Sequence, residues 1–237
     1  MDEIVSWLAI LSGGLIVTIE LSLLTIVFTV VLSVILAICR VCPWRPARML
    51  ASFHVDLFRS IPLLALLMFF YYGLGRVAAQ LGVSGFWLVV AGLTLSESAY
   101  LSEVYRGGLL AIPQSQWEAA NSLGLRFRSI IWHVLLPQAV PSAIPATLNM
   151  LISIIKNSSL ASLVAVSEVT LVATVLVSNT FEPMQVYLVL AVLYLAMILP
   201  ISLLSRWFES HVGHANLSLA DHHYTAAESP PAPQPET

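Results

Sequence analysis

From Leu8 to Ile38 the chain is apolar almost without interruption, and Glu20 is the only charged side chain in that run. A helix of about 20 mostly apolar residues is long enough to cross a lipid bilayer. The run is longer than the roughly 7–15 apolar residues of a signal-peptide core, and acidic rather than basic residues precede it. We therefore expect a retained membrane-spanning helix here.

The remainder of the chain has the same character. Charged residues make up only 10% of the sequence, whereas soluble domains average about 25%. The apolar segments lack strand-like alternation, and a helix satisfies its own backbone hydrogen bonds in lipid, so an all-α membrane protein is expected. The pattern predicts about five spans, near residues 9–38, 58–80, 86–108, 138–178 and 184–206. These spans form a domain over residues 1–209, and the Pro-rich segment 210–237 is expected to be a disordered tail.

The fourth span is too long for one straight crossing. We expect it to break at a polar cluster made of Lys156, Asn157, Ser158 and Ser159. Broken helices occur at membrane depth where the freed backbone groups line a cavity. The cluster is therefore a candidate part of a pathway for a polar solute.

The basic residues predict the orientation of the spans. Arg76 lies on one side and Lys156 within a span, whereas the other eight basic residues share the opposite side if five spans alternate. Cytoplasmic loops are enriched in Lys and Arg. The sequence therefore predicts an outside N-terminus and a cytoplasmic C-terminus.

The longest cytoplasmic loop, residues 112–137, has its own local pattern. Ser115 and Glu118 have the spacing of a capping box, which predicts a short helix that starts there. Gly124 fits the end of that helix, where a positive φ is needed, and Pro137 marks the beginning of the fourth span. We expect a compact helical knob with Trp117, Phe127 and Trp132 as anchors for a partner, since the loop also offers small residues for close approach.

The sequence Glu118-Ala119-Ala120, followed by Gly124 and by Val134-Leu-Leu-Pro137, resembles the EAA loop of bacterial ABC importer permeases. The similarity extends collinearly over about residues 10–210 and is closest to the polar amino acid subfamily. It includes the segments 56–64, 71–73, 99–108, 154–160 and 168–170. Where that family often has glutamine after the Pro62-Leu-Leu segment, this chain has Ala65-Leu66, a difference that could tune substrate choice.

The resemblance implies a type I ABC importer transmembrane fold in the bacterial cytoplasmic membrane, surrounded by membrane lipid. It also implies three protein partners, which are ATPase subunits, a second permease (identical or paralogous) and an extracytoplasmic substrate-binding protein. An amino acid or a related compound would be the substrate, and no nucleic acid is implicated. The residues that would contact the ATPase in the coupling loop are Trp117, Glu118, Ala119, Ala120, Gly124 and Pro137.

The chain itself does not carry the ATPase. A P-loop requires a lysine within Gly-x-x-x-x-Gly-Lys-Ser/Thr, and the only lysine, Lys156, follows Ile154 and Ile155. ATP and Mg²⁺ are therefore expected on a partner subunit, and no cofactor or metal is expected in this chain. No nucleophile–base pair or metal cluster stands out, so no enzyme is predicted.

Ionisable groups at membrane depth are candidates for function. An amino acid needs a cation for its carboxylate, which Lys156 could provide together with nearby hydroxyl and amide groups. Its ammonium group needs an anion, for which Glu97 and Glu168 are the candidates. Alternatively, Lys156 pairs with one of these carboxylates and holds the pathway together. Glu20 could serve a subunit interface, an internal pair or translocation.

Two other classes of function remain open from the residues alone. A stand-alone secondary transporter would be expected to have inverted repeats and buried carboxylates, and Glu20, Glu97 and Glu168 keep that possibility alive. An intramembrane enzyme would need a paired catalytic constellation at membrane depth, which is not evident.

Overall fold

The computed structural model describes residues 2–227, and within that range the regular elements are all helices. The α-helices are α1 (Asp2–Val41), α2 (Arg45–Ser60), α3 (Leu63–Met68), α4 (Leu74–Gln80), α5 (Gly85–Leu110), α6 (Gln114–Ser122), α7 (Phe127–Ile130), α8 (Leu136–Asn157), α9 (Val169–Thr180) and α10 (Pro183–Ala227). Two π-helical turns, η1 (Phe69–Gly73) and η2 (Ile131–Leu135), and a 3₁₀ segment, η3 (Ser158–Val164), connect some of them. The predicted all-α fold is confirmed.

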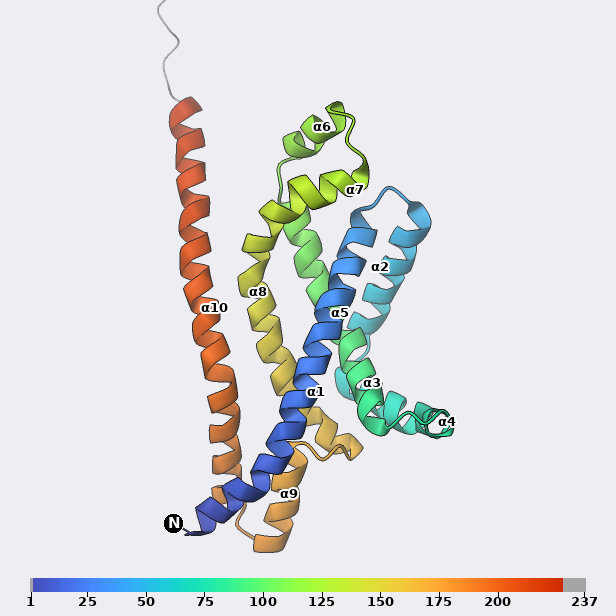
Figure 1. The fold of residues 1–237 in the computed structure, drawn as a ribbon, viewed down its shortest axis with the longest axis vertical. Coiled ribbons are helices and arrows are strands. Elements are labelled where there is room, and N and C mark those ends of the chain that lie inside the picture. Colours follow the sequence, from blue (N-terminus) through green and yellow to red (C-terminus); the bar gives the residue numbers. More distant parts are fainter. Residues whose placement is uncertain (1, 228–237) are drawn as a thin grey trace, which may run out of the picture.

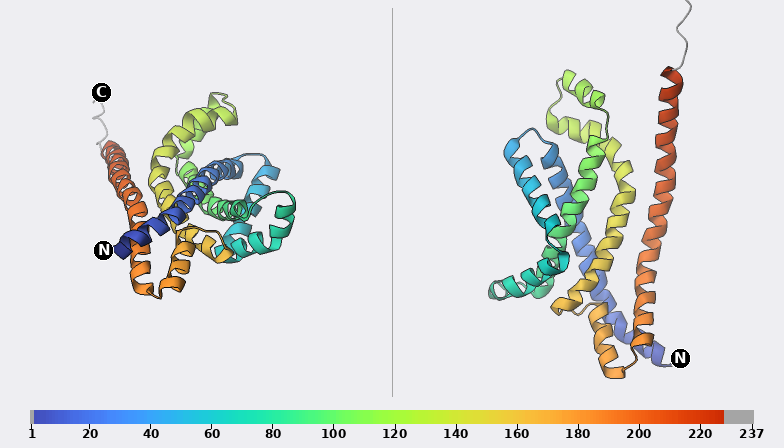
Figure 2. Two further views of the ribbon diagram at one scale, coloured as in Figure 1. Left: turned by 60° about the horizontal axis from the view of Figure 1, so that its bottom comes forward. Right: turned by 180° about the vertical axis from the view of Figure 1, so that it is seen from behind.

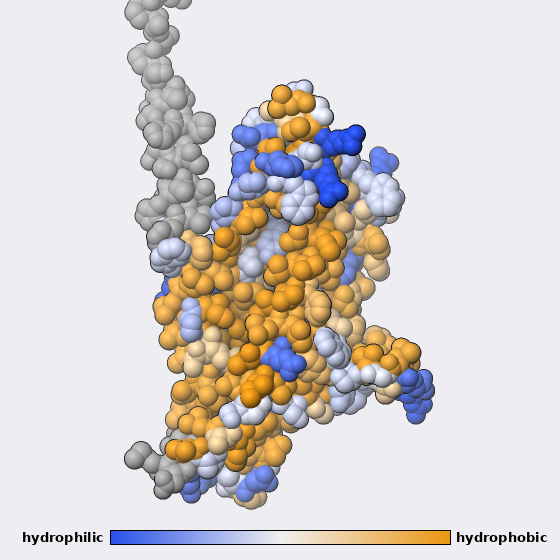
Figure 3. Space-filling model, viewed as in Figure 1, coloured by the Kyte–Doolittle hydropathy of each residue, from blue (hydrophilic) through white to orange (hydrophobic). Residues whose placement is uncertain are grey.

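The apolar helices run roughly along one axis and present an apolar exterior (Figures 1 and 3). In the described part of the chain, four segments are long and apolar enough to cross a membrane, namely Val5–Val41, Leu63–Gln80, Phe127–Val164 and Pro183–Ser210. The third predicted span corresponds to α5, whose 26 residues match the needed length although it carries several charges. These five segments correspond to the five predicted spans.

The long helices α1 and α5 cross at the centre of the molecule, and α2, α8 and α9 pack around them (Figures 1 and 2). Gly14 lets α1 come close to α9, because a Cβ at this position would lie 2.8 Å from Cα of Val169. A buried apolar cluster from α1, α9 and α10, which includes Trp7, Leu11 and Val186, surrounds this crossing.

An additional helix lies before the second crossing. This is α2, an amphipathic helix that starts at Arg45 and runs back along α1 (Figure 1). Pro62 then separates α2 from α3, and α4 turns across the long axis of the molecule. The candidate span Leu63–Gln80 lies within the predicted range 58–80, and α2 precedes it as a further helix that has a polar face and buries Ala51 and Val55.

The break in the fourth span lies where the polar cluster predicted it. Helix α8 ends at Asn157 and gives way to the 3₁₀ turn of η3, after which Ala165 adopts a positive φ of 56°. A short irregular segment follows, and α9 begins at Val169. The single apolar stretch 138–178 is therefore two helices joined by an irregular connection.

The two ends of the molecule differ in composition (Figure 3). One end holds α6, α7, the turn between α1 and α2, and the C-terminal end of α10 (Figure 1). The opposite end holds the N-terminus, α4 and the turn between α9 and α10. Helix α10 is continuous through residue 210 and ends at Ala227, and the last part of the predicted tail, residues 228–237, lies outside the described residues.

Candidate functional site

The loop between α5 and α8 folds as a short helix followed by a sharp turn. Helix α6 begins after Pro113, which occupies the N-cap position, and Ser115 makes no capping bond. The predicted capping box is therefore wrong, because the helix has its N-cap at Pro113, two residues earlier, and Ser115 lies inside the first turn. The Glu118 carboxylate instead accepts a hydrogen bond from the Gln114 side-chain amide at 2.8 Å.

Helix α6 exposes one face and buries the other. Glu118 and Ala119 are exposed, whereas Ala120 is only 4% exposed and packs in an apolar cluster with Leu109 and Ile131. Gly124 ends the knob with a φ of +70°, as predicted, and a side chain at this backbone conformation would be strained. The loop is therefore fixed to the membrane helices on one side and free to contact a partner on the other.

The connection from this knob into α8 is a nearly continuous helix. Helix α7 passes into the π turn η2, and Pro137 occupies the first turn of α8, as the sequence predicted. Of the three predicted aromatic anchors, Trp117 and Phe127 are half-buried against the apolar cluster below α6, and Trp132 is 56% exposed. A movement of α6 can therefore be transmitted directly to α8.

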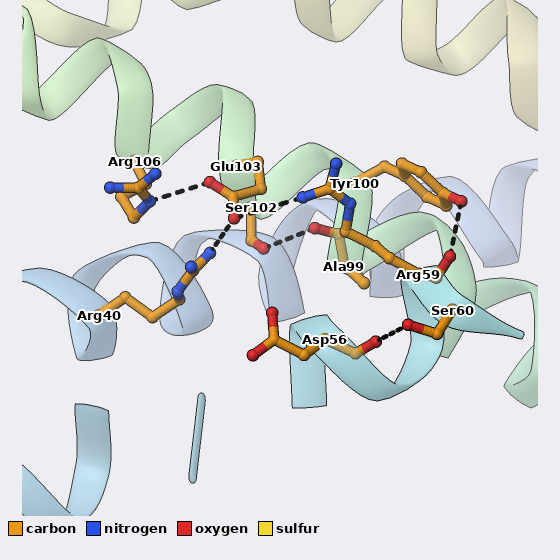
Figure 4. A network of polar contacts seen from close by, with 9 residues as sticks. All are labelled: Arg40, Asp56, Arg59, Ser60, Ala99, Tyr100, Ser102, Glu103 and Arg106. Carbon is orange, nitrogen blue, oxygen red and sulfur yellow. Dashed lines mark hydrogen bonds and ion pairs between the residues drawn. The ribbon is translucent and has the colours of Figure 1, made fainter. Parts of the chain in front are cut away.

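A charge cluster lies below this knob, centred on the Glu103 carboxylate (Figure 4). Arg40 from α1, Arg59 from α2 and Arg106 from α5 all form ion pairs with it, the last at 2.9 Å. Glu103 and Arg106 are three positions apart on α5, so this pair is local. Arg40 was missed because it lies 63 positions from Glu103 and no local pattern connects the two residues.

Asp56 and Arg59 lie three positions apart on α2, but no ion pair joins them in the described residues. The Arg59 guanidinium turns toward α5, where it reaches Glu103 and lies 5.4 Å from the centre of the Tyr100 ring. Asp56 is exposed and forms no ion pair within residues 2–227. The cluster therefore ties three helices, α1, α2 and α5, to each other at the end that carries the knob.

The break in α8 brings two of the predicted pathway residues together. The Asn157 side-chain amide donates a hydrogen bond of 2.6 Å to the carboxylate of Glu97, which is 4% exposed in the middle of α5. A buried carboxylate is costly unless hydrogen bonds or an opposite charge compensate it. Here one neutral donor is present, which leaves the carboxylate capacity to bind a second donor.

The other residues of the polar cluster face different directions. Lys156 is exposed, and within the described chain no ion pair joins it to Glu97 or Glu168. Ser158 is completely buried and donates its hydroxyl to the carbonyl of Ile155, and Ser159 donates to that of Lys156. The structure thus places Lys156 and the Glu97–Asn157 pair at the same helix end without direct contact between the two charges.

Glu168 lies completely buried at the N-terminus of α9. Its carboxylate accepts hydrogen bonds from the Leu171 amide at 2.8 Å and from the Tyr194 hydroxyl at 3.2 Å. Thr18 lies 3.4 Å from the same carboxylate and accepts a hydrogen bond from the amide of Val169. Glu168 therefore joins α1, α9 and α10. The carboxylate at a helix start was a sequence signal for an N-cap that the pathway hypothesis overlooked.

Comparisons with known proteins agree with this arrangement. Residues 29–214 match the family described as "Binding-protein-dependent transport system inner membrane component". The chain is similar to the probable amino-acid ABC transporter permease PatM of Vibrio harveyi, with 34% identity over 84% of this chain and 89% of that protein. It is also similar to the L-cystine transport system permease TcyB of Bacillus subtilis, with 37% identity over 69% of each chain.

A solved structure shows the same similarity in three dimensions. A crystal structure of an amino acid ABC transporter with histidines matches this fold with a TM-score of 0.77 and 30% sequence identity, over 88% of this chain and 97% of that one. The matches in sequence and in fold extend over the spans, the knob and the break in α8. They decide against the stand-alone secondary transporter and against an enzyme. The chain belongs to the inner-membrane components of binding-protein-dependent transport systems, and it is a membrane-spanning permease subunit of an ABC importer.

Proposed function

We propose that this permease carries amino acids, above all polar ones, from the outside to the cytoplasm. The pathway is formed together with a second permease. The observation that carries the proposal is the pairing of Glu97 with Asn157 at the break of α8, beside the exposed Lys156. The similar permeases PatM and TcyB are named for amino acids and for cystine, which supports the same class here.

The proposed site matches both ends of an amino acid zwitterion. Glu97 would accept the ammonium group, because its carboxylate has lone pairs beyond the one bound by Asn157. Lys156 and Ser159 would meet the carboxylate as it passes the helix break. Asn157 and Ser158 would hold the shape of the break, and Glu168 would fix the adjoining wall through its contacts with α1 and α10.

The proposed orientation places the end with α6 in the cytoplasm. Figure 1 supports it, because α6, α7 and the Arg-rich turn after α1 lie at one end and the N-terminus lies at the other. The membrane is then the bacterial cytoplasmic membrane, with the ATPase subunits docked on Trp117, Glu118 and Ala119 from below. ATP and Mg²⁺ would bind to those subunits, and the substrate-binding protein would deliver the amino acid from outside.

The second permease would be a copy of this chain or a paralogue. Apolar side chains such as Phe69, Val77 and Leu188 are well exposed on the spans. This surface can be shared between a partner helix and lipid. Glu20, which is exposed in the middle of α1, would lie at such a contact or beside water, since an isolated carboxylate facing lipid is costly.

Uptake of a panel of radiolabelled amino acids into vesicles tests the substrate proposal. The vesicles contain this chain with its ATPase, and the binding protein is added outside. The variant Glu97→Gln keeps the size of the side chain and removes its charge, so the KM for transport should rise roughly tenfold, the effect of about 1.4 kcal/mol. Glu182→Gln, in the turn between α9 and α10, is the matched control. An unchanged KM for Glu97→Gln, or uptake of no amino acid by the native complex, would contradict the proposal.

A further inference from the structure

Two hollows lie end to end near the α6 end of the molecule. The first is a cavity of about 310 Å³ enclosed by α1, α5 and α8, with Val34, Ile38, Leu109, Ala143 and Ile144 among its aliphatic walls. Its two polar residues, Tyr105 and Thr147, bind one another through their hydroxyls at 3.2 Å. Figure 3 shows the surface hollowed between α1 and α8 within the apolar band, just below the hydrophilic end. The cavity therefore suits a hydrocarbon chain that enters from the side.

The second hollow, of about 400 Å³, is polar and continues toward α6. Its walls follow directly along the same helices, from Ile38 to Val41 on α1 and from Leu109 to Leu110 on α5. It adds a charged and polar lining, made of Arg40, Arg106, Gln114 and Trp117. The apolar cavity is thus followed, toward the hydrophilic end, by a polar hollow. Two guanidinium groups, the Gln114 amide and the Trp117 indole line that hollow.

Two guanidinium groups, those of Arg40 and Arg106, line this second hollow. Arg40 and Arg106 on its lining share the single carboxylate of Glu103, and Arg59, which lies outside the lining, pairs with the same carboxylate (Figure 4). The Arg106 side chain is 33% exposed and keeps donors free, because one guanidinium has five N–H groups. Guanidinium groups bind phosphate in bidentate geometry, and basic pockets between membrane helices bind anionic head groups.

We propose that the two hollows form one binding site for an anionic phospholipid of the leaflet next to α6. One acyl chain fills the cavity between α1, α5 and α8. The phosphate lies between Arg40 and Arg106, and Gln114 and Trp117 contact the rest of the head group. Because Gln114 also binds Glu118, the lipid supports α6 from the membrane side and stiffens the knob on which the ATPase acts. The site does not depend on which solute the permease carries.

Native mass spectrometry of the delipidated permease–ATPase complex in detergent tests this site. The complex is titrated with phosphatidylglycerol and with phosphatidylcholine that carries the same acyl chains. We expect phosphatidylglycerol to bind at least about tenfold more tightly, the effect of one charge-assisted contact. Arg106→Gln should abolish this preference, whereas Arg76→Gln, at the opposite end of the molecule, should retain it.

A second variant separates the acyl chain from the head group. Ala143→Leu fills the apolar cavity without a change of charge and should weaken both lipids, whereas Ala79→Leu on the exposed face of α4 should weaken neither. Equal affinity for the two lipids, or lipid binding that neither Arg106→Gln nor Ala143→Leu changes, would overturn the proposal.

Two other outcomes would also overturn it and would identify a different occupant. Displacement of the lipid by inorganic phosphate, with no effect of Ala143→Leu, would indicate a site for a free anion. Lipid binding by the permease alone but never by its complex would show that an acidic segment of the ATPase occupies the pocket instead.

Discussion

At the scale of single residues, the structure depends on a close approach between two helices that are far apart in sequence. Gly14 allows α1 to contact the start of α9, and Thr18, one turn further, reaches the Val169 amide and the Glu168 carboxylate. The approach adds the Thr18 hydroxyl to the Leu171 amide and the Tyr194 hydroxyl around the buried carboxylate of Glu168. The packing of α1 against the start of α9 therefore depends on the absence of a side chain at position 14.

We predict that Gly14→Ala destabilises the permease. The new Cβ would lie 2.8 Å from both Val169 Cα and Val172 Cγ2, and overpacking of this kind costs about 1–3 kcal/mol. Gly13→Ala is the matched control, because its Cβ would meet no atom within 4 Å. Thermal unfolding of the detergent-solubilised protein measures the difference, with a lower midpoint for Gly14→Ala. Equal midpoints for the two variants would show that the helices separate without cost.

Residue-level features were predictable from the sequence only where the signal is local. Gly124 and Pro137 could be placed because a positive φ and the first turn of a helix each favour one residue type. The capping box at Ser115 failed because Pro113 competed for the same helix start. The contacts of Arg40 with Glu103 and of Thr18 with Glu168 join residues far apart in sequence, so no local pattern could reveal them.

At the scale of elements, α8 connects the knob to the break beside Glu97, and its proline pattern shapes that connection. Pro137, Pro141 and Pro145 follow one another at intervals of four, so they lie along one side of the helix. Proline has no N–H, so the carbonyls one turn before Pro141 and Pro145 lose their usual donors. Ser205 of α10 donates to the Pro145 carbonyl at 3.3 Å. The first half of α8 is therefore held less by its own backbone than the second half.

We predict that Pro141→Ala makes this half of α8 more rigid. The alanine N–H can donate to the Pro137 carbonyl, which restores a helical hydrogen bond. Hydrogen–deuterium exchange of the solubilised protein should slow in a peptide that covers residues 138–148. The control Pro43→Ala, in the turn between α1 and α2, should leave that peptide unchanged. Faster exchange after Pro141→Ala would mean that the proline stabilises the helix.

Among the elements, the break at Asn157 was predictable because polar residues interrupt a long apolar run at one place. Helix α2 was not predictable, because an amphipathic helix packed against other helices has too low a mean hydropathy to be distinguished from a loop. Only the packing of α2 against α1 and α5 reveals that Arg45–Ser60 belongs to the helix bundle.

At the scale of the whole molecule, the two ends of the bundle have different roles in the proposed cycle. The end with α6 would receive movement from the ATPase, and the end with the α9–α10 turn would meet the binding protein.

Labelling of single cysteines in membrane vesicles tests this orientation. The two native cysteines, Cys39 and Cys42, are first replaced by serine. A cysteine at Asn121 should react with a membrane-impermeant maleimide only from the cytoplasmic side, and one at Asn179 only from outside. The reverse pattern would contradict the orientation.

The central claim is that movement of a separate ATPase reaches the pathway through α6. The most direct measurement compares ATP-driven amino acid uptake with ATP hydrolysis in reconstituted complexes that carry Glu118→Lys, with Gln116→Lys on the same helix as control. Glu118 is exposed and holds Gln114, so its reversal should change the docking face and not the folding of the bundle. We predict assembled Glu118→Lys complexes in which uptake falls at least about tenfold, while the control retains most of its uptake. Undiminished ATP-driven uptake in the Glu118→Lys complex would contradict the account.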